Sequence, residues 1–273
     1  MTNIFFHSTD NLQLKGCCWE IANPKAILAI VHGMGEHSAR FNELSSFFND
    51  NGLVVVAFDH RGHGMSEGKR GHTPSYDQLL SDVDQFLNFI NGLYSNLPIF
   101  LMGHSMGGNI VLNYSLSKKH KCTGIIASSP WLRLAKLPPT WLVSIARIIN
   151  KVYPKLTFNT DLDPNLISRD NEVVKQYIED PMVHSKITSN FYLQVNNAGE
   201  KALHLANKNN IPTLVFHGSE DGLTSHLASI EFAERSPNTI LKIWEGLYHE
   251  TYNEPEKKEV LEFLLTWIKK LIK

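Results

Sequence analysis

A serine lies at the centre of the pentapeptide Gly103-His104-Ser105-Met106-Gly107, between an apolar run at 98–102 and an amphipathic stretch at 109–116. This order predicts a strand, a tight turn and a helix, and such a turn projects the serine hydroxyl away from the backbone. Glycine on either side allows a close backbone approach that a Cβ would prevent. Chance alone produces this pattern in roughly one chain in ten of this length. The residues downstream therefore decide whether Ser105 is a nucleophile.

A serine nucleophile needs a base to take its proton and an acid to orient that base. In folds with this type of serine turn, the acid and then the base follow the serine along the chain. A loop after a later apolar run supplies two candidate acids, Glu220 and Asp221. Of the two histidines that follow, His226 is a few residues into a predicted helix, and His249 lies in the loop after the last predicted strand. Since the base must reach Ser105 across the end of a sheet, we favour His249.

The oxyanion that forms during acyl transfer needs backbone N–H donors. The amide of Met106, directly after the candidate nucleophile, can provide one. We expect the second from the loop after an early strand, where Gly33 and Gly35 flank Met34 and allow its amide to approach the reacting carbonyl. Each donor would supply on the order of 3 kcal/mol of transition-state stabilisation. The sequence thus predicts an acyl-transfer site with every group at a strand end.

Short apolar runs alternate with helical patterns along most of the chain. Strands are expected at 26–31, 53–58, 98–102, 124–128, 212–216 and 239–244. Helices are expected at about 39–49, 75–93, 109–116, 225–235 and 255–272. Continuous apolar strands that alternate with helices predict an α/β fold with a mostly parallel sheet covered on both faces. The segment 12–21 is expected to add an antiparallel strand at the edge of the sheet.

The segment 131–209 breaks this rhythm with Pro138-Pro139, a helix-like stretch at 140–152 and a polar middle. We interpret it as a helical cap inserted over the carboxyl edge of the sheet, between core segments 1–130 and 210–273. The helix-like stretch has one apolar stripe: Trp141, Leu142, Ile145, Ile148, Ile149 and Val152. We expect this stripe to pack on the core or to line an acyl tunnel. The alternative is transient contact of the cap with a membrane.

Composition narrows the class of protein. The chain has 273 residues, of which 42% are hydrophobic, and this fits one large domain or one domain with an insertion. Its net charge of −1 makes nucleic acid an unexpected partner. The three cysteines, two of them adjacent, argue against a disulfide framework and for a reducing compartment. With no signal-peptide pattern at the N-terminus, we expect a cytoplasmic protein. No spacing resembles a zinc site, so neither a metal nor a cofactor is expected.

Several segments resemble the monoacylglycerol lipase and lysophospholipase group of α/β-hydrolases (serine aminopeptidase S33-like hydrolases). They are His32-Gly-Met-Gly-Glu-His-Ser38, Phe58-Asp-His-Arg-Gly-His-Gly-Met-Ser-Glu-Gly68, Gly103-His-Ser-Met-Gly-Gly108, His217-Gly-Ser-Glu-Asp221 and Trp244-Glu-Gly-Leu-Tyr-His249. The resemblance implies an α/β-hydrolase fold, Asp221 as the triad acid, and Met34 and Met106 as oxyanion donors. It also implies that the cap is a lid over an acyl tunnel. The better-known members usually have a small residue in place of Met34.

The resemblance extends to the cap segments 167–170 and 177–181, which implies that Tyr177 contacts the polar head of the substrate. Glu36, Arg40 and His104 are further candidates for substrate binding. The alternatives are an ion pair between Glu36 and Arg40, four positions apart, and a supporting hydrogen bond from His104.

The segment Asp59-His60-Arg61-Gly62-His63 offers a carboxylate and two histidines, the residue types of a metal site. We interpret it instead as a polar turn that Asp59 and Arg61 hold in place.

The leading functional hypothesis is a serine hydrolase that cleaves esters of single-chain lipids, of the monoacylglycerol or lysophospholipid type, through an acyl-enzyme. The same triad could act as a short-chain carboxylesterase or as a serine aminopeptidase. An aminopeptidase needs acidic groups to hold the free amine of its substrate, and the cap has Asp161, Asp163, Asp170, Glu172, Glu179 and Asp180. A non-catalytic ligand-binding protein on the same fold is a third reading.

Overall fold

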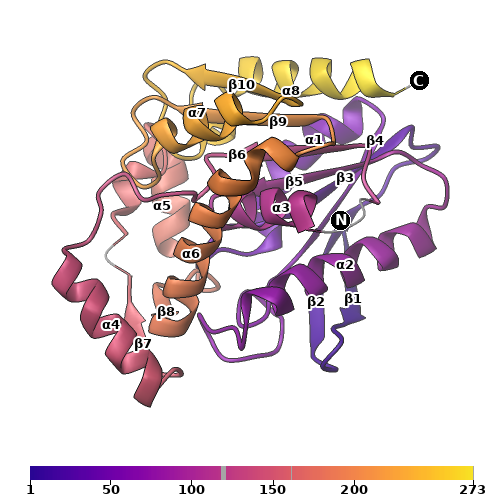
Figure 1. Cartoon of the computed structure of the whole chain (residues 1–273). Helices are drawn as coiled ribbons and strands as arrows, with labels where there is room; N and C mark the ends of the chain where they lie inside the picture. Colours follow the sequence, from indigo (N-terminus) through magenta and orange to yellow (C-terminus); the bar gives the residue numbers. More distant parts are fainter. Residues whose placement is uncertain (118–120, 161, 273) are drawn as a thin grey trace.

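The computed structural model describes residues 1–117, 121–160 and 162–272, and its centre is an eight-stranded sheet. The strands lie in the order β1 (Thr2–His7), β2 (Gln13–Trp19), β4 (Leu53–Phe58), β3 (Ala26–Val31), β5 (Ile99–His104), β6 (Gly124–Ser128), β9 (Thr213–Gly218) and β10 (Thr239–Trp244). Strand β2 pairs antiparallel with β1 and β4, and the pairs from β4 to β10 are parallel. This is the α/β-hydrolase architecture expected from the sequence (Figure 1).

The central strands are buried on both faces, which explains their unbroken apolar sequences. Every residue of Ala26–Val31 and of Leu53–Phe58 is buried, and the two strands pair in parallel along their full length. Parallel strands need crossover helices, and these helices cover the faces of the sheet. The carboxyl ends of β3, β5, β9 and β10 consequently meet at one edge, where the loops that carry the candidate site residues begin.

Helices cover both faces of the sheet (Figure 1). One apolar cluster includes side chains of α2 (Tyr76–Leu93), α3 (Met106–Ser117), α6 (Ser189–Leu205) and α7 (His226–Arg235). The cluster on the other face includes α1 (Asn42–Asp50) and α8 (Lys257–Leu271). Helix α2 begins as its sequence predicts, because the Ser75 hydroxyl accepts a hydrogen bond from the Gln78 amide. Short 3-10 turns occur at Ser38–Phe41, Pro164–Leu166, Ala206–Lys208 and Thr251–Asn253.

The sequence-based prediction of the sheet edge was wrong. The segment 12–21 does form the antiparallel strand β2, but β1 lies outside it and is the true edge. Strand β1 was missed because only Phe6 among its residues is buried, so no apolar run marks it.

The segment 131–209 has more structure than its polar sequence indicates. It contains α4 (Thr140–Val152), α5 (Asn171–Glu179), α6 and a small antiparallel pair, β7 (Thr157–Asn159) and β8 (Lys186–Thr188). Helix α6 contacts α3, and its side chains Phe191, Val195 and Ala202 belong to the main core cluster. The division into a core (1–130, 210–273) and a cap (131–209) stays our proposal, with α6 as the part of the cap that packs on the core.

The apolar stripe of α4 does not pack on the core, which was one of the two arrangements that we expected. None of the residues of α4 is buried, and Trp141 and Ile148 are 63% and 64% exposed. The helix contacts α6, and its half-buried residues are Val143, Ala146, Ile149 and Asn150. Most of the predicted stripe therefore faces solvent in this structure.

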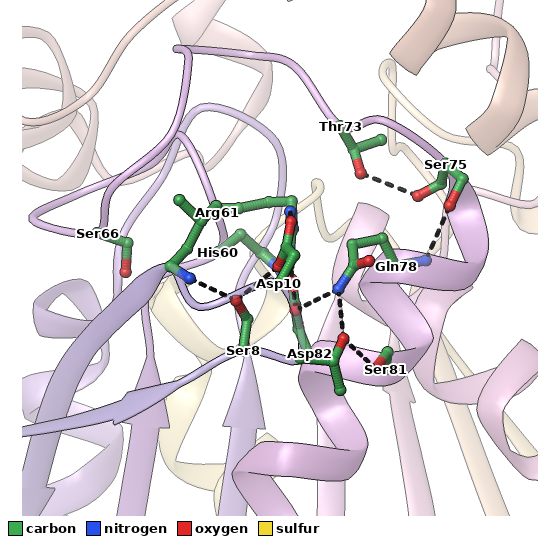
Figure 2. A network of polar contacts seen from close by, with 12 residues as sticks. Ser8, Asp10, His60, Arg61, Ser66, Thr73, Ser75, Gln78, Ser81 and Asp82 are labelled. Carbon is green, nitrogen blue, oxygen red and sulfur yellow. Dashed lines mark hydrogen bonds and ion pairs between the residues drawn. The ribbon is translucent and has the colours of Figure 1, made fainter.

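The polar turn at 59–63 is held as predicted. The carboxylate of Asp59 accepts hydrogen bonds from the amides of Ser38 and Met65. The guanidinium of Arg61 lies between Asp10 and Asp82, with donor–acceptor distances of 2.7–2.9 Å (Figure 2). These contacts fix the loop after β4 through charge-assisted hydrogen bonds.

No helix within the described residues is both long and apolar enough to span a bilayer. The three cysteines, Cys17, Cys18 and Cys122, are unpaired.

Candidate active site

Ser105 occupies the turn between β5 and α3 and has a strained backbone. Its φ angle is +53°, in the left-handed region that a residue with a Cβ rarely adopts. Three backbone hydrogen bonds hold it there: its amide donates to Ser128, and its carbonyl accepts from Asn109 and Trp131. The turn also packs tightly, since a Cβ on Gly107 would lie 2.0 Å from the Val31 carbonyl oxygen. Strain of this kind persists only where the surrounding structure enforces it, and it is typical of functional sites.

Asp221 and His249 meet at the ends of β9 and β10. The Nδ1–H of His249 donates to Oδ2 of Asp221 at 2.6 Å, and both side chains are almost completely buried. A further hydrogen bond fixes the loop that carries His249: the Ser129 hydroxyl donates to the His249 carbonyl at 2.7 Å. The other ring nitrogen of His249, Nε2, is thereby left to act as the base.

Asp221 accepts more hydrogen bonds than the sequence indicated. Its Oδ2 also accepts from His217 Nε2 at 2.9 Å and from the Thr224 hydroxyl at 2.8 Å, and its Oδ1 accepts from the amides of Leu223 and Thr224. His217 in turn is held through Nδ1 by Ser229 at 2.8 Å. Sequence reasoning assigned no role to His217. Its position on a buried strand, four residues before the acid, is the signal that could have identified it.

These contacts lower the pKa of Asp221 and raise the pKa of His249. Burial alone would raise the pKa of Asp221, but the neighbouring His249 and His217 hold it well below its usual value. Burial alone would lower the pKa of His249, yet Asp221, followed by Glu250 and Glu36, raises it above its usual value. The carboxylate is therefore ionised and the imidazole is a stronger base than a free histidine.

The alternative acid and base lie elsewhere. Glu220 is exposed, and Asp221 makes the contact with His249. His226 is the first residue of α7, and its ring centroid lies 6.3 Å from that of His217.

The two candidate oxyanion amides lie beside the serine turn. Met106 is the first residue of α3, so its N–H has no acceptor one turn earlier in the helix. The loop of Met34 passes close to the serine, since a Cβ on Gly33 would lie 3.1 Å from Ser105 Cβ. Within the described residues, the Ser105 hydroxyl makes no hydrogen bond, so the Ser105–His249 contact is not closed in this structure. Contacts of this kind are often long before substrate binds.

Glu36, Arg40, His104 and Tyr177 are brought together next to His249. Arg40 donates to Glu36 at 2.5 Å and lies 4.7 Å from the centre of the Tyr177 ring. The rings of His104 and His249 are 4.6 Å apart. The Glu36–Arg40 ion pair is confirmed, although Glu36 precedes the 3-10 turn at 38–41 instead of lying within a helix.

Glu250 completes this group and was missed by the sequence analysis. Both of its carboxylate oxygens accept from Arg40, at 2.7 and 3.0 Å. No short-range pattern marks this pair, because 210 positions separate the two residues. We call Glu36, Arg40 and Glu250 the Arg40 cluster.

Glu36, His104 and Glu250 each offer a ligand atom within 4.8 Å of the others, as a metal site would. The guanidinium of Arg40 already pairs with both carboxylates. The donor set therefore fits an ion-pair cluster better than a cation site.

Comparison with known proteins places these observations in a family. Residues 22–256 match the family model described as "Serine aminopeptidase, S33". The chain is 34% identical over 249 residues to a monoacylglycerol lipase of Mycolicibacterium smegmatis, which covers 90% of this chain and 89% of that protein. It is 36% identical to an uncharacterized abhydrolase domain-containing protein of Dictyostelium discoideum, of which it spans only 29%. The crystal structure of a monoacylglycerol lipase from Paleococcus ferrophilus superposes with a TM-score of 0.85 at 32% identity, covering 94% of this chain and 99% of the other.

Proposed function

Because this chain belongs to the serine aminopeptidase, S33, family and to the monoglyceride lipase group of α/β-hydrolases, we propose that it is a serine hydrolase that cleaves carboxylic esters of single-chain lipids. The observation that carries the proposal is the 2.6 Å contact between Asp221 and His249 beside a serine held at positive φ. Monoacylglycerols are the proposed substrate class, as in the names of the relatives, and lysophospholipids are the second.

The proposed reaction proceeds through an acyl-enzyme. Ser105 Oγ attacks the ester carbonyl while His249 Nε2 takes its proton, and Asp221 stabilises the imidazolium that forms. The amides of Met34 and Met106 donate to the oxyanion. His249 then protonates the departing alcohol and activates water for deacylation. No step requires a metal or a cofactor.

The polar head of the substrate is proposed to lie near Tyr177, His104, Glu36 and Arg40. The ring of His104 lies beside that of His249, which must protonate the leaving alcohol, and Tyr177 packs against Arg40. A glycerol head offers hydroxyls that can hydrogen-bond to such groups.

The cap is proposed to contact membranes transiently through α4. Its exposed apolar residues include Trp141, Leu142, Ile145, Ile148 and Val152. The segment 136–160 contains four cations, Lys136, Arg147, Lys151 and Lys155, and no acidic residue. An exposed apolar face with cations beside it is typical of helices that bind at a lipid interface. A cytoplasmic location stays a proposal drawn from the cysteine content.

The aminopeptidase alternative gains no support from the described acids of the cap. Asp163 and Asp170 cap helices, Asp180 pairs with His37, and Glu172 and Glu179 are exposed. Asp161 lies outside the described residues.

The decisive test is kcat/KM for monoacylglycerols and nitrophenyl esters with acyl chains of increasing length, with aminoacyl-anilides in parallel. Ser105→Ala is the control, and fluorophosphonate labelling reports on the nucleophile. We expect ester turnover that Ser105→Ala abolishes. Turnover that survives this substitution, or a wild-type protein that does not label, would refute the proposal.

A further inference from the structure

The Arg40 cluster is a buried set of charges directly beside the proposed triad. Arg40 Nη1 donates to Glu36 Oε2 at 2.5 Å and to Glu250 Oε1 at 2.7 Å, and Nη2 donates to Glu250 Oε2 at 3.0 Å. The side chains of Arg40, Glu36 and Glu250 are only 10%, 5% and 2% exposed. Short, charge-assisted contacts with bidentate geometry are the strongest hydrogen bonds that side chains make.

Each carboxylate of the cluster belongs to a different catalytic loop. Glu36 Oε1 accepts from the amide of Gly33 at 3.0 Å, and the next residue is Met34, the proposed oxyanion donor. Glu250 directly follows His249, and its Oε2 also accepts from Asn253 at 2.7 Å. Arg40 thus connects the loop of the oxyanion amide to the loop of the base.

We propose that Glu250 is a positioning residue for ester hydrolysis, which holds the His249 loop against the Met34 loop through Arg40 and Glu36. This inference rests on the proposed function. A displacement of about 1 Å between reacting groups can cost roughly 100-fold in rate, so a contact that fixes two loops at once has a direct catalytic effect. The substrate need not touch Glu250 for this role.

The cluster also sets the charge around the base. Two carboxylates and one guanidinium carry one formal negative charge, and this charge favours the imidazolium form of His249. The other titratable groups near His249 are Asp221 in the loop after β9, His217 in β9 and His104 in β5. Tyr252 packs against His104, and Tyr177 of the cap packs against Arg40. Of these neighbours, Asp221 raises the pKa of His249 most, and Glu250 follows.

Two substitutions of Glu250 separate the effect of its side-chain length from the effect of its charge. Glu250→Gln keeps the length of the side chain and removes its charge, so we expect the acid limb of the pH–kcat/KM profile to move to lower pH. Glu250→Asp keeps the charge and shortens the reach to Arg40, so we expect kcat to fall by about 10- to 100-fold with the acid limb unmoved. A side chain with only a structural role would produce neither pattern.

Two substrates distinguish a positioning role of Glu250 from a role in binding the polar head of the substrate. Both variants are assayed with a monoacylglycerol and with a nitrophenyl ester, which has no glycerol head. For Glu250→Asp we expect kcat to fall with both substrates while KM changes little. A rise in KM for the monoacylglycerol alone would overturn the proposal, because Glu250 would then act through binding of the polar head.

Controls keep the result independent of folding and of the proposed function. Glu256→Gln removes an exposed carboxylate that pairs with Arg169 nearby, and we expect a wild-type profile. If the Glu250 variants do not fold, Arg40→Lys tests the same contact, since lysine keeps the positive charge but cannot form the bidentate hydrogen bonds of a guanidinium. Suppose that the wild type is active, that Ser105→Ala is inactive, and that the Glu250 variants have the kcat and pH profile of the wild type. This result would refute the positioning role of Glu250 and leave the proposed function intact. Activity in Ser105→Ala would instead refute the proposed function.

Discussion

Oδ2 of Asp221 lies 2.6 Å from Nδ1 of His249 and belongs to a carboxylate that has no exposed side-chain surface. The same oxygen accepts a second histidine, His217, at 2.9 Å. Two imidazoles therefore share one carboxylate: His217 lies in β9, and His249 lies in the loop after β10. This arrangement predicts how several substitutions affect activity and stability.

Asp221→Asn should lower kcat by about 10⁴-fold, because the amide no longer fixes the His249 tautomer or stabilises its cation. The measurement is steady-state hydrolysis of a nitrophenyl ester. Glu220→Gln, one residue earlier and exposed, is the matched control and should leave kcat unchanged. Equal losses in the two variants would show that Asp221 is not the orienting acid.

Substitutions at Ser105 should separate activity from backbone strain. Ser105→Ala and Ser105→Gly should both be inactive, but the glycine variant should be about 1 kcal/mol more stable than the alanine variant, because only glycine adopts φ of +53° without strain. Urea denaturation measures the difference. An alanine variant as stable as the glycine variant would mean that the turn relaxes when the hydroxyl is lost.

The raised pKa of His249 predicts the pH dependence of catalysis. The base must be neutral to act, so kcat/KM should fall as the pH drops through a pKa above the usual 6.5 of histidine. The profile is measured with a nitrophenyl ester between pH 5 and 9, a range chosen to bracket that value. An acid limb centred below pH 6.5 would contradict the predicted electrostatics.

Buried His60 predicts a loss of stability in acid. Burial lowers its pKa to about 4, below the usual 6.5, so the unfolded chain binds the extra proton first as the pH falls. The free energy of unfolding should therefore fall by about 2 kcal/mol from this group between pH 7.5 and pH 5. His60→Gln keeps a donor for the His32 carbonyl and lacks the titration, so its denaturant midpoints should vary less with pH. Parallel curves for the two proteins would exclude His60 as the source.

Exposed residues of α4 should control binding to lipid but not the chemistry. Trp141→Ser and Ile148→Ser should each weaken binding to vesicles of phosphatidylcholine and phosphatidylglycerol by about 10-fold, given the free energy of burying such side chains. Leu227→Ser, equally exposed at 64% on α7, is the matched control. Hydrolysis of a water-soluble short-chain ester should be unchanged in all three. Unaltered vesicle binding in the α4 variants would refute membrane contact through this helix.

Periodicity located most of the fold, and it failed where burial is partial. The fully buried strands β3 and β4 match their predicted ranges, because burial on both faces leaves an uninterrupted apolar sequence. The edge strand β1 exposes most of its side chains and gave no such signal. In α4, periodicity found the helix but not its environment, since an apolar stripe looks the same whether core or solvent covers it.

The sequence by itself determined the order of the candidate site: a serine turn, then an acid loop, then a base loop, each after a strand. These features are local, because a turn or a strand end depends on a few adjacent residues. Only the tertiary structure decided which groups meet. It pairs Asp221 rather than Glu220 with His249, adds His217 to the same carboxylate, and joins Arg40 to Glu250 across 210 positions. Such contacts depend on the packing of a whole sheet, which no short stretch of sequence encodes.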